Sequence, residues 1–273
     1  WKSPRWKASW RCSLRSSRRS ASCARSRTPQ TEPIVPACQY CLRAAQRGFT
    51  LVEIAIALVV IGLLLGAIFK GEELITQARV KRVIADFSSV SVAYHGYFDR
   101  YGALPGDDAG AAARWAATSG DGNALVAGTY NNGNAACDAS VESCSWWDHL
   151  RRAGFISGSG ALQPRNVAGG LTGVQTGDGT APAYGPVLGG AAGAGGFSVL
   201  IHCSANLPEK IAIAVDTQLD DGSRTGGTVR GMLQAAPNPP IAVDATAAAA
   251  GGVGSYVETG TNVYALCRAM QAP

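Results

Sequence analysis

The chain has 273 residues, of which 47% are hydrophobic and 16% are charged. A chain of this length and composition can bury one ordinary core or two small ones, and it is too apolar to be a disordered polymer. Its net charge of +5 is uneven, because eleven of the 24 Lys and Arg but one of the 19 acids precede Phe49, which leaves −5 on the remainder. The acidic remainder argues against a nucleic-acid partner, although Arg151 and Arg152 offer a local basic patch.

Residues 1–48 are expected to form a cationic leader. Residues 1–41 combine Trp, Arg, Ser and Cys without hydrophobic periodicity and contain no Met. We hypothesise that translation starts at Val35 or Leu42, so that most of residues 1–41 are never made; a genuine disordered basic arm is the alternative. The Cys-x-x-Cys at 38–41 has no second pair to complete a zinc site, so it does not indicate one.

Residues 49–69 form an apolar run with the sequence FTLVEIAIALVVIGLLLGAIF. At about 1.5 Å per residue, a helix of this length spans the roughly 30 Å hydrocarbon core of a bilayer. Arg43 and Arg47 precede the run, which predicts that the short N-terminal side stays in the cytoplasm and that the rest is exported. A secretory signal peptide would instead have a shorter apolar region followed by its cleavage site. We therefore expect a single membrane-spanning helix that is retained.

Glu53 interrupts this apolar run, and a carboxylate there costs roughly 2.5–3.5 kcal/mol on membrane-insertion scales. One explanation is that Glu53 lies close enough to the membrane interface to reach lipid headgroups. A second comes from Gly48-Phe49-Thr50-Leu51-Val52-Glu53, which resembles the cleavage and methylation signature of type IV prepilins and type II secretion pseudopilins. The similarity covers the glycine, the aromatic residue after it, the threonine, two aliphatic residues and the glutamate.

This resemblance implies a route of processing and assembly. A membrane-embedded prepilin peptidase would cut between Gly48 and Phe49 and methylate the new amine of Phe49. In the fibre, Glu53 of one subunit would neutralise the N-terminal amine of a neighbour, since a paired charge in apolar surroundings is far cheaper than a lone one. The implied partners are the prepilin peptidase, other pilin or pseudopilin subunits and the inner membrane.

After Lys70 the apolar residues become periodic, which predicts that the helix continues with one buried face. They recur at spacings of three and four, at Val80, Val83, Ile84, Phe87, Val90, Tyr94, Phe98 and Tyr101. Because no proline interrupts the pattern before Pro105, one helix is expected from Phe49 to about Arg100, with residues 70–104 as its amphipathic continuation. Many major pilins carry a proline at the position of Lys70, so its absence favours a minor subunit.

Residues 105–273 are expected to form an exported head that is rich in Gly and Ala. A short amphipathic helix is predicted around Trp146–Ile156, ending at Gly154. Asn206-Leu207-Pro208-Glu209 is typical of a helix start, with Asn as the cap and Glu in the capping-box position. Strand-like runs cover residues 197–203, 228–233, 255–258 and 263–268, and the flexible loops expected from low complexity are 189–196 and 245–252. The prediction is a pilin-like α+β fold, a long N-terminal helix packed on a small antiparallel sheet.

Four cysteines follow the apolar run, on the exported side where disulfides persist. Four cysteines allow three pairings, and the sequence does not choose among them. We favour Cys137 with Cys144, which closes a short loop, and Cys203 with Cys267, which lie in strand-like segments.

No catalytic activity and no cofactor are predicted, because the three histidines belong to no HExxH or GxSxG arrangement. Each fits a surface or core position: His95, His149 and His202. Asp216, Asp220 and Asp221 offer hard oxygen ligands for calcium, but turns and helix ends use the same residues, so no metal is predicted and the three remain weak calcium candidates. The pair Trp146-Trp147 is favoured as a core anchor over an exposed ligand platform.

The function expected from these features is that of a structural subunit of a type IV pilus or type II secretion pseudopilus. It would cross the bacterial inner membrane once with its head in the periplasm before it enters the fibre. Two alternatives remain. One is a tip or minor pilin whose head is a binding module for a surface, DNA or secreted cargo. The other is a single-span anchored exported protein in which the motif is accidental.

Overall fold

The computed structural model describes residues 48–132, 137–189, 195–235 and 255–270. The expectations for the leader, for the loop 245–252 and for most of the loop 189–196 lie outside these residues. The chain divides into two compact units between Glu53 and Ile54, and the second unit contains nearly all of the secondary structure.

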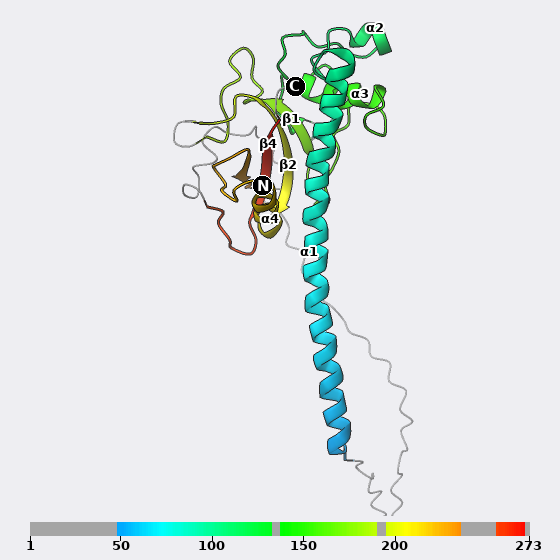
Figure 1. Ribbon diagram of the computed structural model, residues 1–273, viewed down its shortest axis with the longest axis vertical. Coiled ribbons are helices and arrows are strands. Elements are labelled where there is room, and N and C mark those ends of the chain that lie inside the picture. The colour runs from blue at the N-terminus through cyan, green and yellow to red at the C-terminus, as the bar shows by residue number, and fades with distance from the viewer. Residues whose placement is uncertain (1–47, 133–136, 190–194, 236–254, 271–273) are drawn as a thin grey trace, which may run out of the picture. The chain divides into compact units, whose positions relative to one another are not determined.

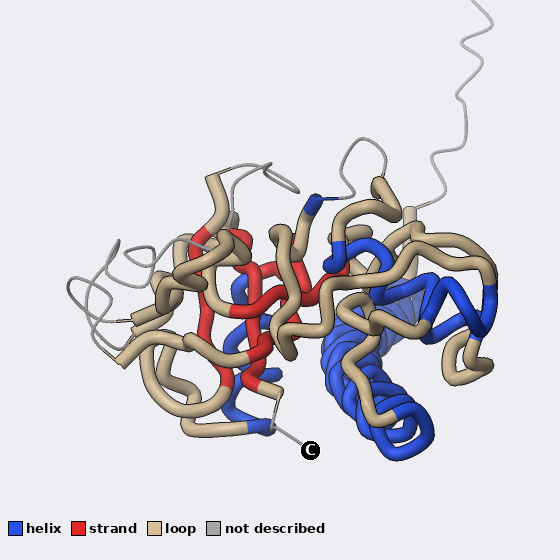
Figure 2. Tube along the Cα trace, turned by 90° about the horizontal axis from the view of Figure 1, so that it is seen from above, coloured by secondary structure: helices blue, strands red, loops and turns tan. Residues whose placement is uncertain are grey.

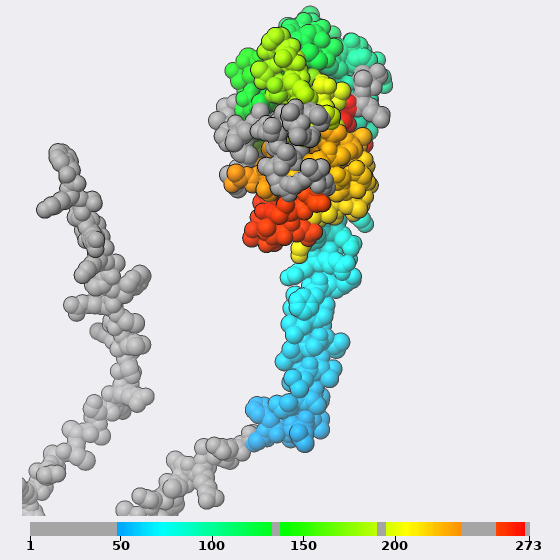
Figure 3. Space-filling model, turned by 90° about the vertical axis from the view of Figure 1, so that its left-hand side faces the viewer, coloured from blue at the N-terminus to red at the C-terminus, as the bar shows by residue number. Residues whose placement is uncertain are grey.

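Helix α1 runs from Leu51 to Tyr101 and confirms the long helix expected from the sequence. Its residues from Val80 onward are buried at spacings of three and four, which confirms the predicted amphipathic face. These buried positions are Val80, Val83, Phe87, Val90, Ala93, Tyr94 and Tyr97. Figure 1 shows this part of α1 alongside the sheet, whereas Figure 3 shows the stretch that follows Ile54 without any cover from the head.

The head contains one antiparallel sheet of four strands in the order β1-β2-β4-β3. The strands are β1 (Thr172–Thr176), β2 (Leu200–Pro208), β3 (Val229–Leu233) and β4 (Val263–Ala269). Figure 2 shows them as one group beside α1. Strand β1 was not predicted, since its sequence TGVQT is short and neither apolar nor alternating. Residues 255–258 were expected to be a strand, which is wrong, because they form a loop held by the Tyr264 hydroxyl.

The predicted cap of the second head helix is also wrong. Helix α4 runs from Glu209 to Leu219, and Asn206 belongs to β2, where a register shift in the pairing with β4 gives it a φ of 58°. The Asn206 N–H donates to Gln234 Oε1 rather than its side chain capping α4. The carboxylate of Glu209 accepts hydrogen bonds from the N–H groups of Thr259 and Gly260, so strand pairing overrides the local capping signal.

Helix α3 (Glu142–Arg152) supplies the centre of the core beside α1. Trp146 and Trp147 are fully buried, and the Trp146 ring stacks on Tyr94 of α1 with 5.5 Å between centroids. The tryptophans are therefore core anchors, as favoured from the sequence. Gly154 follows the helix with a φ of 81°, a left-handed conformation that glycine adopts without strain. The short helix α2 (Ala111–Trp115) precedes α3 in the chain.

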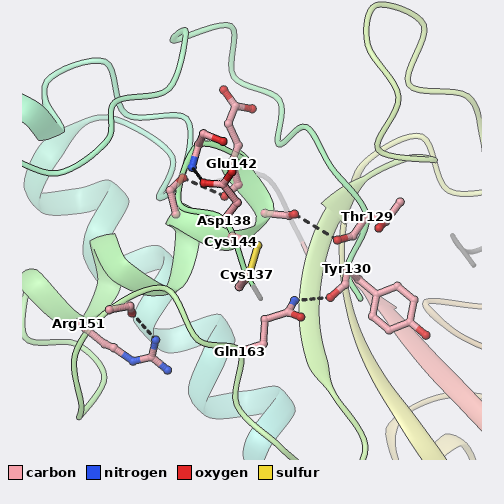
Figure 4. The surroundings of a disulfide bond; sticks show 12 residues. Thr129, Tyr130, Cys137, Asp138, Glu142, Cys144, Arg151 and Gln163 are labelled. Carbon is pink, nitrogen blue, oxygen red and sulfur yellow. Dashed lines mark hydrogen bonds between the residues drawn. A yellow bond between two sulfur atoms is a disulfide. The ribbon is translucent and has the colours of Figure 1, made fainter. Parts of the chain in front are cut away.

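Two disulfides close the head in the pairing favoured from the sequence. Cys203 and Cys267 are partners in register on β2 and β4. Cys137 joins Cys144 on α3, and Figure 4 shows this bond near Gln163, whose amide donates to the carbonyl of Tyr130.

The sheet has two buried faces. His202, Leu266 and Tyr264 lie on the face toward α1 and α4, where the His202 ring meets Phe87 edge-on at 4.9 Å. The opposite face carries the Cys203–Cys267 pair and is covered by apolar loop residues rather than by a helix, namely Tyr130, Val187, Leu188 and Phe197. The head therefore has a core of its own on each side of the sheet.

Candidate processing and assembly site

The residues expected at the cleavage point are accessible. Gly48, Phe49 and Thr50 precede α1 in irregular, exposed backbone. A Cβ added at Gly48 would meet no atom within 4 Å, so its environment does not require glycine. A peptidase can therefore reach the peptide bond between Gly48 and Phe49 without unfolding any described element.

Thr50 caps the helix that follows. Its Oγ1 accepts a hydrogen bond from the N–H of Glu53 at 3.1 Å, which is the N-cap bond to the third helical residue. Thr-x-x-Glu is the spacing of a capping box, a signal that is visible in the sequence but was not predicted as a helix start. The part of the motif between Phe49 and Glu53 thus has a physical task, since it fixes where α1 begins.

Only the backbone N–H of Glu53 takes part in the cap, so its side-chain carboxylate is available for another interaction. The side chain is exposed, and among the described residues it forms no ion pair. A carboxylate in the first turn also lies at the positive end of the helix dipole. Its geometry is thus compatible with pairing to a cation from outside the chain.

The stretch of α1 after Glu53 presents bare apolar side chains around its whole circumference. They are 46–70% exposed, namely Ile54, Ile56, Leu58, Val59, Val60, Ile61, Leu63, Leu64, Leu65, Ile68 and Phe69. Among the described residues, α1 is the one helix long and apolar enough to cross a membrane. A surface of this size is far larger than a monomeric soluble protein exposes, so it requires an apolar environment.

The apolar stretch ends at a polar step on the same helix. Lys70 Nζ lies 2.5 Å from Glu73 Oε2, and both side chains are exposed. The helix continues through Lys70 without interruption to its buried half. One rigid element therefore carries both the bare apolar surface and the face that packs on the head.

Residues 43–69 match the family described as the prokaryotic N-terminal methylation motif. The matched residues contain the expected processing residues Gly48 and Phe49, the cap Thr50, and Glu53. In this chain the motif opens an apolar helix that continues into an α+β head. Over these residues the chain is similar to prepilin-type proteins, which supports a type IV pilin-like or pseudopilin-like identity, and the helix that the motif opens is long and apolar enough to cross a membrane. No curated protein and no solved structure matches the chain.

The other residues considered from the sequence lie in the head. Asp216, Asp220 and Asp221 each place a carboxylate oxygen within 4.8 Å of the others. A second cluster of Asp107, Asp121 and Glu142 was missed, because Glu142 is far from the other two in sequence. Burial raises the pKa of Asp107 to about 6, although the N–H groups of Gly122, Asn123 and Ala124 donate hydrogen bonds to its carboxylate.

His149 and Arg152 have structural positions. His149 accepts a hydrogen bond at Nδ1 from the N–H of Gly106 at 2.9 Å, and its Nε2 lies 2.7 Å from the carbonyl of Thr118, which fits a neutral ring. Burial lowers its pKa, in keeping with that state. Arg152 pairs with Asp148 at 2.7 Å, so the basic patch considered from the sequence is partly neutralised.

Proposed function

We propose that this chain is a structural subunit of a type IV pilus or a type II secretion pseudopilus. A prepilin peptidase would cut it after Gly48, and residues 49–69 would hold it in the inner membrane and then in the fibre. One observation carries this proposal: α1 is bare and apolar in its first half and is buried against its own head in its second half.

The exposed first half of α1 needs an apolar environment both before and after assembly. A bilayer satisfies it before assembly, and helices of neighbouring subunits can satisfy it afterwards, because both surround the helix with hydrocarbon. An accidental motif on a single-span anchor would account for the first environment only. The exposed Glu53 favours the second, since in a fibre it would find the cationic amine of a neighbouring Phe49.

We further propose a minor position in the fibre and a periplasmic head. The basic residues Arg43 and Arg47 before the span favour a cytoplasmic leader and an exported head. The two disulfides of the head fit an oxidising compartment. The unbroken helix at Lys70, without the proline of many major pilins, supports the minor position.

Mass spectrometry of the mature N-terminus tests the proposal. The full chain is co-expressed with a prepilin peptidase, and the expected product begins at N-methylated Phe49. The Gly48→Val variant is the matched control, because a larger side chain at Gly48 meets no neighbouring atom and leaves the fold unchanged. This variant should remain uncut at that bond.

Two results would overturn the proposal. An intact leader in the wild type would favour the anchored exported protein. A cut beyond Phe69 would mean that the apolar run is a removable signal rather than an assembly helix.

A further inference from the structure

A cavity of about 320 Å³ lies between the buried half of α1 and the sheet. Ser91 and His95 line it from successive turns of α1, while His202 of β2 and Arg268 of β4 line it from the sheet. His202 and Arg268 are cross-strand partners, so their side chains leave the same face of the sheet, the one that meets Phe87 of α1. None of the described residues that line the cavity is acidic, so its fixed charge is the positive charge of Arg268.

Arg268 differs from the other arginines of the head. Each of the others donates a hydrogen bond to a protein oxygen, namely Arg114, Arg151, Arg152, Arg165, Arg224 and Arg230. The partly buried side chain of Arg268 forms no ion pair and no hydrogen bond within the part of the chain that the structure describes. A guanidinium carries five donors in a fixed fork that matches a carboxylate, so Arg268 offers this fork to a ligand in the cavity.

Ser91 offers a second donor from the facing helix. The two preceding serines of α1, Ser88 and Ser89, donate their hydroxyl protons to helix carbonyls four and three residues earlier. Such a bond is one way in which a helix accommodates serine. The hydroxyl of Ser91 makes no such bond with any described residue, so it can donate into the cavity that it lines.

The remaining walls of the cavity are largely apolar. Phe87, Val199 and Met270 contribute to them. Val199 and Met270 also line a second cavity of about 690 Å³, which extends along α1 to Phe98 and reaches Leu104. The two cavities therefore adjoin, with a cationic group in one and an apolar surface leading into the other. A ligand with one anionic end and an apolar tail is complementary to both.

We propose that this pair of cavities binds a small organic acid that carries an apolar tail. The guanidinium of Arg268 pairs with the carboxylate, and the hydroxyl of Ser91 and a ring N–H of His95 donate to it. The tail lies against Met270 and continues into the second cavity. A phosphate fits less well, because it carries nearly two negative charges at neutral pH and the cavity offers one guanidinium to neutralise them.

This site is independent of the proposed assembly function, because it lies between the sheet and the buried half of α1 and makes no use of the motif. The test uses the full chain in detergent micelles and measures binding by calorimetry, with protein-free micelles as the blank. Hexanoate should bind with a dissociation constant on the order of 1 mM. Acetate has the charge without the tail, and 1-hexanol has the tail without the charge. Each should bind about tenfold more weakly or worse.

Arg268→Gln is the main test variant, because it removes the charge without breaking any described hydrogen bond or ion pair. Arg79→Gln is the matched control, since Arg79 is an exposed arginine of α1 that also lacks an ion pair among the described residues and lines neither cavity. Arg268→Gln should weaken hexanoate binding about tenfold or more, as expected for a charged hydrogen bond, and leave 1-hexanol binding unchanged. Arg79→Gln should bind both ligands like the wild type.

A second pair of variants tests the site from the helix side. Ser91→Ala removes a hydroxyl that lines the cavity, and it should weaken hexanoate binding about fivefold, as expected for a neutral hydrogen bond. Ser88→Ala is its control, because the Ser88 hydroxyl donates to the carbonyl of Ile84 and lines neither cavity. This control should bind hexanoate like the wild type.

Four outcomes would overturn the proposal. The first is no heat above the blank up to about 50 mM hexanoate, well beyond the expected range. The second is equal affinity for hexanoate and 1-hexanol, which would indicate apolar binding without Arg268. The third is equal weakening by Arg268→Gln and Arg79→Gln, which would indicate diffuse attraction of anions. The fourth is tighter binding of inorganic phosphate than of hexanoate, which would assign the cavity to a different anion.

Discussion

His202 shows how burial decides what a single residue does. Its ring lies between Phe87 of α1 and Trp147 of α3, and its Nε2 has no hydrogen-bond partner among the described residues. Burial, with a smaller contribution from the charge of Arg268, lowers the pKa of His202 to about 3. The imidazole is therefore neutral and acts as a core side chain.

This burial predicts a loss of head stability in acid. The unfolded chain binds a proton at His202 below a pH of about 6.5 and the folded chain does not until about 3, so the unfolded state gains as the pH falls through this window. Between pH 7 and pH 5, the protonation of His202 in the unfolded chain should therefore lower the free energy of unfolding by about 2 kcal/mol. The loss is measured as the free energy of unfolding in urea, with the full chain in micelles.

Two variants separate His202 from the acids that also titrate in this range. His202→Phe and His202→Gln both remove the titrating ring, one apolar and one polar, and differ in absolute stability. Between pH 7 and pH 5, the unfolding free energy of both variants should rise relative to that of the wild type by the same amount, about 2 kcal/mol. Profiles parallel to the wild type would show that His202 is protonated in the folded head or exposed.

The roles that could be predicted were those of residues whose neighbours in the sequence indicate what they do. The pair Trp146-Trp147 was expected in the core because large aromatic side chains in a glycine-rich domain seldom lack a packing role. The cluster of Asp107, Asp121 and Glu142 could not be found, since only the folded chain brings Glu142 to the other two. The Thr50 cap had a visible signal, Thr-x-x-Glu, but it was read as part of a processing motif alone.

At the scale of elements, the two disulfides restrain the head to different degrees. Cys203–Cys267 joins central strands 64 residues apart, whereas Cys137–Cys144 closes a separation of 7. A disulfide stabilises mainly by restricting the unfolded chain, and this effect grows with the logarithm of the loop length.

Removal of the longer link should therefore cost more. The double variant Cys203→Ala/Cys267→Ala should lose about 2 kcal/mol more unfolding free energy than Cys137→Ala/Cys144→Ala, by the loop-length relation. Each variant serves as the control for the other, since both remove one bond and two sulfurs. Urea unfolding of the non-reduced proteins measures the difference, and equal losses would contradict the loop-length argument.

Elements with strong periodicity were predicted well, and those that depend on distant pairing were not. The sequence pattern of helix α1 extends over many turns, so both of its ends were predicted to within two residues. The start of α4 was placed too early, at Asn206, because β2 continues through Pro208 by pairing with β4. Strand β1 is buried along its whole length but carries no alternation that a sequence pattern could reveal.

At the scale of the whole chain, the prepilin-like arrangement was predictable because its two determinants are contiguous in sequence. The motif around Gly48 and the apolar run after it need no tertiary information, and the family match at residues 43–69 coincides with them. The α+β class of the head was predictable from the sequence. The order of its strands and the contacts of its acidic residues were not, because they arise only on folding. What can be tested at this scale is whether α1 acts as an assembly element.

Glu53 provides that test, because its backbone and its side chain have separable roles. Glu53→Val keeps the N–H that Thr50 caps, so α1 should begin at the same residue. It also removes a charge that costs roughly 2.5–3.5 kcal/mol on insertion, so membrane insertion should be undisturbed or improved. If the carboxylate neutralises the amine of a neighbouring subunit, the variant should be processed normally but fail to enter the fibre.

The comparison that isolates this effect uses Glu72→Val on the same helix. Glu72 is an exposed acid of α1 beyond the apolar stretch, so its loss changes net charge equally without touching the proposed pairing. Fractionation of sheared fibres from cells that express the other subunits, followed by immunodetection, measures incorporation. Glu72→Val should be found in the fibre and Glu53→Val in the membrane alone. Normal incorporation of Glu53→Val would mean that bare apolar packing is sufficient for assembly, and the charge pairing would have to be abandoned.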